Sequence, residues 1–178
     1  VEYAKQTLLQ LHADKITEAE LLTWMYGEGL PKGYCGPTSM SLDTVDDALA
    51  CFLQGTAAGR LSVKDWRVHH WQYFLTQLPE VVSQVQLMDL DETFQLTQST
   101  KAEIACDWFR VAIRNHYDPV LPALSAYLVR IGRGKFVRPL YAELQIAGYH
   151  SELKDIYTKA RAGYHPSIQV QLDKSLSL

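Results

Sequence analysis

Apolar residues recur at steps of three and four along most of the chain, the spacing that predicts amphipathic α-helices. Stripes of this kind run over residues 18–26, 43–54, 63–78, 82–94, 101–113, 119–131, 140–147 and 151–162. No run of β-branched residues alternates with period two. Short turns between such helices are typical of an antiparallel helical array. We therefore predict one all-α domain over residues 1–178, an armadillo-like α-solenoid of about seven to nine helices.

Capping signals predict where several of these helices begin. Thr17 and Glu20 have the spacing of a capping box, as do the pair Ser62 and Asp65 and the pair Thr100 and Glu103. Asp118 followed by Pro119 is also a strong start signal, because proline fits the first helical turn. The tail from His165 is left open between a short helix and an extended segment.

One long stretch, residues 27–41, is rich in residues that break regular structure. It contains four glycines and two prolines. A loop of this length inside a compact domain is either functional or packed across a surface.

The stretch from Gly132 to Leu140 joins two predicted helices and carries the most informative charges. Gly132 is expected to close the first helix in the left-handed conformation, and Pro139 to lie in the first turn of the next. If the turn between them is extended, the side chains of Arg133 and Lys135 leave it on the same side. They would then lie near a helix N-terminus, which favours anions. The sequence thus offers a site for a carboxylate or a phosphate.

A simpler interpretation of the same charges is purely structural. Arg133 follows the end of a helix, where a cation complements the dipole, and Lys135 is then only solvated. Arg138 is expected to pair with Glu143 or with a neighbouring domain rather than with a ligand.

Composition and charge exclude several classes of protein. Apolar residues make up 47% of the chain and charged residues 21%, as in ordinary globular proteins. The net charge of −3 argues against binding to nucleic acid or to an anionic membrane. The longest nearly apolar run, residues 120–129, is too short to span a bilayer. The first residue is valine, which indicates an excised or processed fragment.

Candidate catalytic and metal-binding groups are few. No histidine opens a His-Glu-x-x-His motif, and the adjacent His69 and His70 diverge on a helix. We expect buried thiols for at least Cys51 and Cys106 and no cysteine catalysis, because nothing pairs Cys106 locally with a histidine. Three cysteines at unpatterned spacings fit a reducing, cytoplasmic compartment. We therefore assign no catalytic residue and no metal ligand to this chain.

The central stretch Gly132-Arg133-x-Lys135-Phe136-x-Arg138-Pro139-Leu140 resembles a segment of leukotriene A4 hydrolase and its zinc aminopeptidase relatives. Three further landmarks occur in the order of that family's C-terminal domain: Trp24-Met25-Tyr26-x-x-Gly29-Leu30-Pro31, Trp108-Phe109-Arg110 and Tyr164-His165-Pro166. Gly134 stands where a relative has a methionine. The resemblance covers the chain from about Trp24 to its C-terminus.

This resemblance implies a function for the whole chain. It implies the non-catalytic C-terminal domain of a cytoplasmic zinc aminopeptidase that acts on short peptides. Zinc, its ligands and the general base would lie in the parent's catalytic domain, and the catalytic and N-terminal domains would be the partners of this chain. Residues 27–41 would lie at an inter-domain surface, and Arg133 and Lys135 would bind the C-terminal carboxylate of the substrate. The epoxide hydrolase activity of the vertebrate member cannot be carried over.

Two alternatives belong to other classes of function. The first is a free-standing helical scaffold that binds a partner protein on its concave face. The second is an all-helical enzyme whose site is not recognised, and it has less support than the first.

Overall fold

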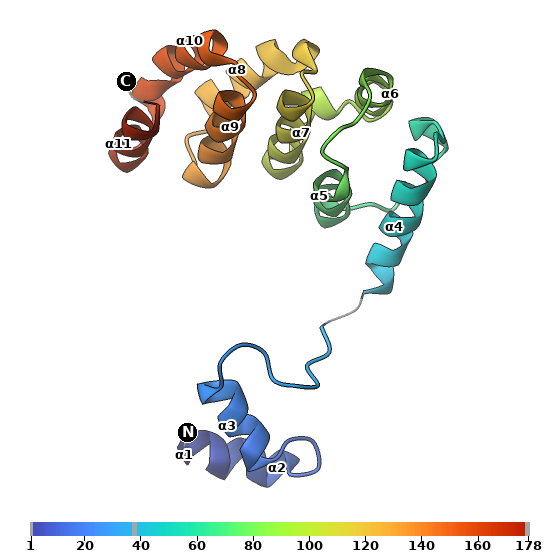
Figure 1. The fold of residues 1–178 in the computed structure, drawn as a ribbon, viewed down its shortest axis with the longest axis vertical. Helices are drawn as coiled ribbons and strands as arrows, with labels where there is room; N and C mark the ends of the chain where they lie inside the picture. The colour runs from blue at the N-terminus through green and yellow to red at the C-terminus, as the bar shows by residue number, and fades with distance from the viewer. Residues whose placement is uncertain (1, 37–38, 177–178) are drawn as a thin grey trace. The chain divides into compact units, whose positions relative to one another are not determined.

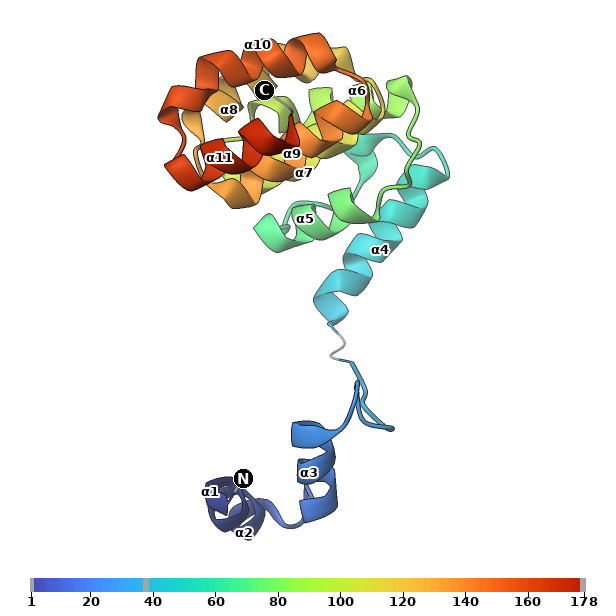
Figure 2. The same cartoon turned by 60° about the vertical axis from the view of Figure 1, so that its left-hand side comes forward.

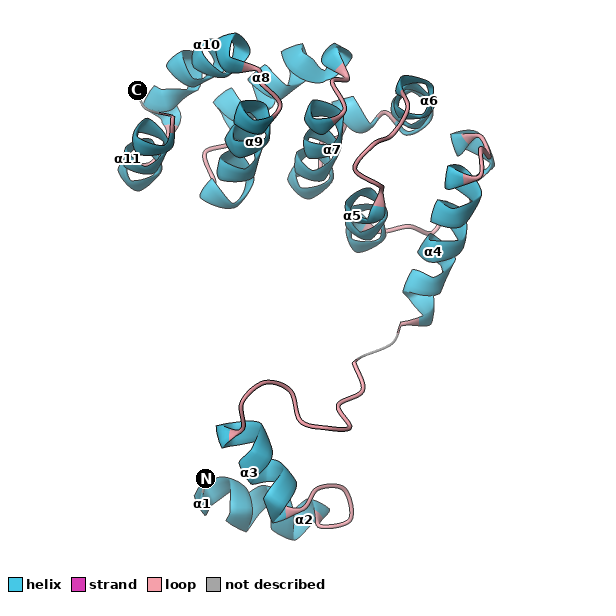
Figure 3. Cartoon of the chain, viewed as in Figure 1, coloured by secondary structure: helices cyan, strands magenta, loops and turns pink. Residues whose placement is uncertain are grey.

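The computed structural model describes residues 2–36 and 39–176. Within these residues all regular elements are helical, as Figure 3 shows, which confirms the predicted all-α class. None of the described helices has both the length and the apolar character needed to cross a membrane. The chain divides into two compact units, residues 1–39 and 40–178, and each is described by itself. The single domain over residues 1–178 stays a prediction.

The first unit consists of short helices followed by a loop. Its elements are α1 (Glu2–Ala4), a π-helical stretch (Lys5–Leu9), α2 (Gln10–His12) and α3 (Glu18–Tyr26). The predicted capping box begins α3: the backbone N–H of Thr17 donates to the Glu20 carboxylate at 2.8 Å, and the Glu20 N–H donates to Thr17 Oγ1 at 3.3 Å. Residues 27–36 form no regular element, as predicted, and residues 37–38 lie outside the described part.

The second unit contains eight α-helices of ten or more residues. They are α4 (Met40–Leu53), α5 (Val68–Gln77), α6 (Gln84–Phe94), α7 (Ala102–Arg114), α8 (Leu121–Arg130), α9 (Gly134–Ile146), α10 (His150–Ala160) and α11 (Pro166–Ser175). Apart from α4, Figure 1 shows them in two rows, with α5, α7, α9 and α11 side by side and α6, α8 and α10 in a second row above. Helix α7 packs between α5 and α9, and α10 packs on α8 and α9. The predicted array of antiparallel helices is confirmed.

The direction of the helices decides which ends meet. Figure 2 shows that the helices of the first row run the same way, while those of the second row return. The N-terminal ends of α5, α7, α9 and α11 therefore gather at one edge of the unit, together with the C-terminal ends of α8 and α10. We call this edge the N-terminal edge.

Helix α7 lies at the centre of the core because it is covered on most sides. Eight of its thirteen residues are buried: Ile104, Ala105, Cys106, Trp108, Phe109, Val111, Ala112 and Ile113. Trp108 is fully buried, and its indole N–H donates to Thr97 Oγ1 at 2.9 Å. A tryptophan at this position can be fully buried only because its polar atom has a partner.

Two predicted helix starts are wrong, and a third, at Asp118 and Pro119, is a 3₁₀ turn (Asp118–Val120) that precedes α8. Helix α5 begins at Val68 rather than near Ser62, because Trp66 packs from the preceding turn against Trp71 and Phe74. Helix α7 begins at Ala102 with Lys101 as its N-cap and has no side-chain cap, so Thr100 and Glu103 form no capping box. At the start of α5 tertiary packing overrides a short local signal, and at α7 the N-cap is Lys101 instead of Thr100.

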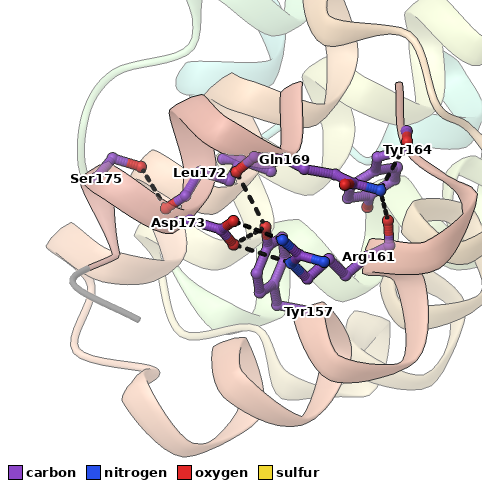
Figure 4. A network of polar contacts seen from close by, with 7 residues as sticks. All are labelled: Tyr157, Arg161, Tyr164, Gln169, Leu172, Asp173 and Ser175. Atoms are coloured by element: carbon purple, nitrogen blue, oxygen red, sulfur yellow. Dashed lines mark hydrogen bonds and ion pairs between the residues drawn. The ribbon is translucent and has the colours of Figure 1, made fainter. Parts of the chain in front are cut away.

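The tail after His165 is helical and is held by a network of polar contacts around Asp173, which Figure 4 shows. Tyr157 donates to Asp173 Oδ1 at 2.6 Å, and Arg161 donates through Nε at 3.0 Å and Nη2 at 2.7 Å. Gln169 donates to the carbonyl oxygens of Arg161 and Tyr164 at 2.8 and 3.0 Å. These contacts fasten α11 to α10 and to the turn between them.

The contacts of Asp173 predict an acid-sensitive attachment of α11. Hydrogen bonds from Arg161 and Tyr157 lower the pKa of Asp173 to about 2. A lowered pKa stabilises the fold above the unfolded value of about 3.9, and the contribution is lost as the pH falls toward 2. We expect Asp173→Asn to speed hydrogen exchange in α11 about two- to fivefold at pH 6, because the pair is partly exposed. An exchange rate as slow as that of the unaltered chain would contradict this role.

Candidate functional site

Arg133 and Lys135 lie at the beginning of α9, on the N-terminal edge. Arg133 is the N-cap residue, with φ −80° and ψ 120°, and Lys135 is the second residue of the helix. Both side chains are exposed. The first N–H groups of a helix have no partner in a preceding turn and carry the positive end of its dipole. Two cations and a helix N-terminus therefore occur together, as the sequence predicts.

The ring of Phe136 brings the two cations together. Arg133 Cζ lies 5.8 Å and Lys135 Nζ 5.4 Å from the centroid of this ring. Phe136 itself is buried, and its backbone N–H donates to the carbonyl of Arg133 at 2.9 Å. Arg133 is extended, but Gly134 and Lys135 already belong to α9, so the three residues do not form the extended turn that the sequence predicts. Both cations lie over one aromatic ring instead.

Arg138 adds a third cation to the same turn. A Cβ atom on Gly134 would lie 3.0 Å from a guanidinium nitrogen of Arg138, so this side chain folds back over the first residue of α9. Its predicted pairing with Glu143 is wrong, because that carboxylate binds other arginines. Glu143 Oε1 accepts from Arg114 at 2.9 Å and from Arg110 at 3.2 Å.

Two expectations about the backbone of this turn are also wrong. Gly132 is not in the left-handed region. It is needed instead for close approach, since a Cβ atom there would lie 3.3 Å from the carbonyl oxygen of Gly163. Pro139 lies inside α9 and not in its first turn, because the helix already begins at Gly134.

Asp107 of α7 connects this turn to the neighbouring helix. Burial raises the pKa of its carboxyl, while a hydrogen bond from Gln72 at 3.1 Å and the charges of Arg110 and Lys135 oppose the rise. The field of Lys135 thus reaches the first turns of α7. The helical patterns in the sequence, taken one at a time, do not reveal that Lys135 lies near this carboxylate.

Cys106 is buried below the same turn and is not a nucleophile. Its thiol lies 3.7 Å from the carbonyl oxygen of Phe136. Burial raises its pKa to about 12, so very little thiolate forms at neutral pH. Cys51 was also expected to be buried and is exposed, as is Cys35.

This difference among the cysteines predicts a labelling pattern. Burial raises the pKa of Cys106 well above 8, so little of its thiol is ionised at pH 8, and its sulfur is covered. We expect iodoacetamide to modify Cys35 and Cys51 in the folded chain and Cys106 only after denaturation in urea. Mass spectrometry of peptides counts the modified sites. Rapid labelling of Cys106 in the folded chain would show that the thiol is accessible.

The histidines are not arranged for metal binding. His70 Nδ1 accepts the backbone N–H of Arg67 at 2.9 Å, and its Nε2 is hydrogen-bonded to Ser41 Oγ. Within residues 2–36 and 39–176, no three histidine, cysteine, aspartate or glutamate side chains lie close enough to share a metal ion.

Comparison with known proteins relates this arrangement to one family. The family model described as leukotriene A4 hydrolase, C-terminal, matches residues 66–176. Leucine aminopeptidase 2 from Aspergillus terreus is 29% identical over 188 residues, which cover 97% of this chain and 30% of the relative. Leukotriene A-4 hydrolase from Xenopus laevis is 30% identical over 105 residues, which cover 58% of this chain and 17% of the relative.

Solved structures show the same fold. Yeast LTA4 hydrolase in complex with bestatin superimposes with a TM-score of 0.76 at 20% identity, over 97% of this chain and 32% of the yeast chain. The native yeast enzyme gives a TM-score of 0.75 at 21% identity. The chain thus spans about a third of the length of these proteins.

Proposed function

Because the chain belongs to the leukotriene A4 hydrolase C-terminal domain family, we propose that it is the non-catalytic C-terminal domain of a zinc metallo-aminopeptidase. In this proposal it closes one side of the substrate channel, and Arg133 and Lys135 bind the C-terminal carboxylate of a short peptide. We call these two side chains the carboxylate clamp.

The observation that carries the proposal is that three sources of positive charge occur together in one turn: the side chains of Arg133 and Lys135 and the N-terminal end of α9. Arg133 and Lys135 both lie over Phe136, at the N-terminal end of α9. Arginine presents a planar fork that matches a carboxylate, and lysine adds a compact charge. In the described residues neither side chain forms an ion pair within the chain. Both remain available to a ligand.

The catalytic machinery belongs, in this proposal, to the rest of the parent protein. The relatives are about three times as long as this chain, and those quoted above are named as an aminopeptidase and a hydrolase. The side chains described here do not suit zinc, whose role in such an enzyme is to activate water. We propose that the parent's catalytic domain holds the metal and that the parent is cytoplasmic.

We propose that residues 27–41 face the parent's other domains. In this proposal residues 1–178 act together as one domain. Large apolar side chains in and beside this loop are unusually exposed: Trp24 is 50% exposed, Tyr26 69% and Leu30 66%. Apolar groups at such density are typical of surfaces that another domain covers. The exposure of these side chains supports the inter-domain position that the family resemblance implies.

The test of the clamp is kinetic. Turnover of tripeptides is compared with turnover of chromogenic amino acid amides, which lack a carboxylate, in the full-length enzyme and in its Arg133→Ala variant. A selective loss on tripeptides is expected.

A further inference from the structure

A surface hollow of about 300 Å³ lies between α7, α8 and residues 97–100. Apolar side chains, among them Phe109 and Tyr127, line part of it, and Ser99 and Thr100 supply hydroxyl groups. One charged side chain lines it, that of Arg130. A mixed apolar and polar lining with one charge suits a small amphipathic group.

Arg130 is free to receive a ligand. Its side chain is exposed, and in the described part of the chain no carboxylate lies within ion-pairing distance of it. The hydroxyl of Tyr127 already donates to the carbonyl of Ala102 at 2.9 Å. Among the residues that line the hollow, Arg130 is therefore the one with a charge, and no ion pair opposes that charge.

The hollow adjoins the clamp along the chain. Arg130 and Arg133 are three residues apart, so their Cα atoms lie within about 11 Å. Thr100 on the rim directly precedes Lys101, the N-cap of α7, and α7 packs against α9. Arg130 of the hollow is thus separated from Arg133 of the clamp by only two residues of the chain.

The N-terminal edge carries positive charges that the fold does not require. Arginine or lysine occupies the N-cap position of three helices of the first row: Arg67, Lys101 and Arg133. The fourth N-cap residue, His165, supports its helix, because its Nδ1 accepts the backbone N–H of Ser167 at 3.3 Å. Cations are unfavourable at this end of a helix dipole. Helices α5, α9 and α11 have no acidic residue in their first turn, and Glu103 is the exception in α7. Helix stability therefore does not explain these charges.

We propose that this hollow is a specificity subsite that binds an acidic side chain at or next to the C-terminus of the peptide substrate, with Arg130 as the charge that the side chain meets. The inference rests on the clamp proposed above. A peptide in extended conformation advances about 3.4 Å per residue. With its terminal carboxylate on Arg133 and Lys135, the carboxylate of a final glutamate reaches toward Arg130, and its methylene groups cover the apolar floor.

The test measures kcat/KM of the full-length enzyme on three tripeptides: Ala-Ala-Glu, Ala-Ala-Gln and Ala-Ala-Ala. Glutamine has the shape of glutamate without its charge, so the ratio of the first two isolates the charge. We expect a preference for glutamate of about five- to tenfold. In Arg130→Gln this ratio falls to about one, while turnover of Ala-Ala-Ala changes less than about twofold.

Two further variants sharpen the result. Arg130→Glu is expected to reverse the preference, so that Ala-Ala-Lys becomes better than Ala-Ala-Glu. Lys154→Gln removes an exposed charge from the middle of α10 and is expected to leave the ratio unchanged. Equal turnover of the glutamate and glutamine peptides by the unaltered enzyme overturns the subsite. A preference that survives in Arg130→Gln also overturns it.

The subsite and the clamp fail in different ways. If Arg133→Ala lowers turnover of Ala-Ala-Ala but no acidic preference exists, the clamp stands and the subsite is wrong. If an acidic preference depends on Arg130 but Arg133→Ala has no effect on Ala-Ala-Ala, the clamp is wrong and the terminal carboxylate is held elsewhere; the subsite as stated then falls with it.

Discussion

Replacing Arg133 by alanine is expected to lower kcat/KM on tripeptides by about five- to 150-fold, which corresponds to about 1–3 kcal/mol. The physical reason is the loss of a charge-assisted hydrogen bond to the C-terminal carboxylate, which leaves Lys135 alone on the Phe136 ring. Chromogenic amides should be nearly unaffected, because they have no group for the clamp to bind.

Arg133→Lys provides a matched control that keeps the charge. Lysine cannot form the two parallel bonds of a guanidinium, so an intermediate loss on tripeptides is expected. Steady-state measurement of kcat/KM on tripeptides and on amides distinguishes the unaltered enzyme, Arg133→Ala and Arg133→Lys. Equal losses on tripeptides and amides would refute the clamp, since they would indicate general damage. Unchanged turnover of both would leave Arg133 a solvated helix-end charge.

Replacing Trp108 by alanine is expected to lower the free energy of unfolding of the second unit by about 3–5 kcal/mol. This side chain is fully buried at the centre of α7 and donates a hydrogen bond to Thr97. Its ring meets that of Tyr117 edge to face, with the ring centroids 5.9 Å apart. Its removal leaves a cavity between the two rows and takes a donor from Thr97. A domain of ordinary stability would lose a large part of its free energy of unfolding. The midpoint of urea unfolding, followed by circular dichroism, measures the change.

Trp24 offers the matched comparison within the same chain. It is 50% exposed, and its ring centroid lies 5.6 Å from that of Tyr34. Trp24→Ala is therefore expected to cost less than about 1 kcal/mol. A similar small shift for both tryptophans would mean that the core tolerates the loss of Trp108, and the described packing of α7 would be wrong.

Periodicity predicted the helices well because each of them buries one face. The stripe of Ile104, Trp108 and Val111 in the sequence corresponds to the buried face of α7. Glycine and proline marked the loop at residues 27–36 for the same local reason: they limit backbone conformation regardless of what packs nearby. Each helix can therefore be predicted from its own segment of the sequence.

Helix starts and partners were harder because distant residues decide them. The start of α5 depends on where Trp66 packs, and the partner of Glu143 depends on how α7 approaches α9. Arg130 was overlooked for the same reason, since the hollow that it lines is made by residues 97–100 and two helices. In contrast, the prediction for Arg133 and Lys135 came from their position in a single turn together with the family resemblance, and their role stays a prediction.

The position of Pro139 in the interior of α9 bears on the mobility of the turn that carries the proposed clamp. Proline has no N–H, so the carbonyl of Lys135, four residues earlier, receives no helical hydrogen bond from it. This turn is thus joined to the body of α9 by one hydrogen bond fewer than an ordinary first turn, and such a turn opens locally more often than the helix behind it. If the clamp binds a carboxylate as proposed, the ligand would restrict that motion, and the loss of conformational entropy would lower the affinity.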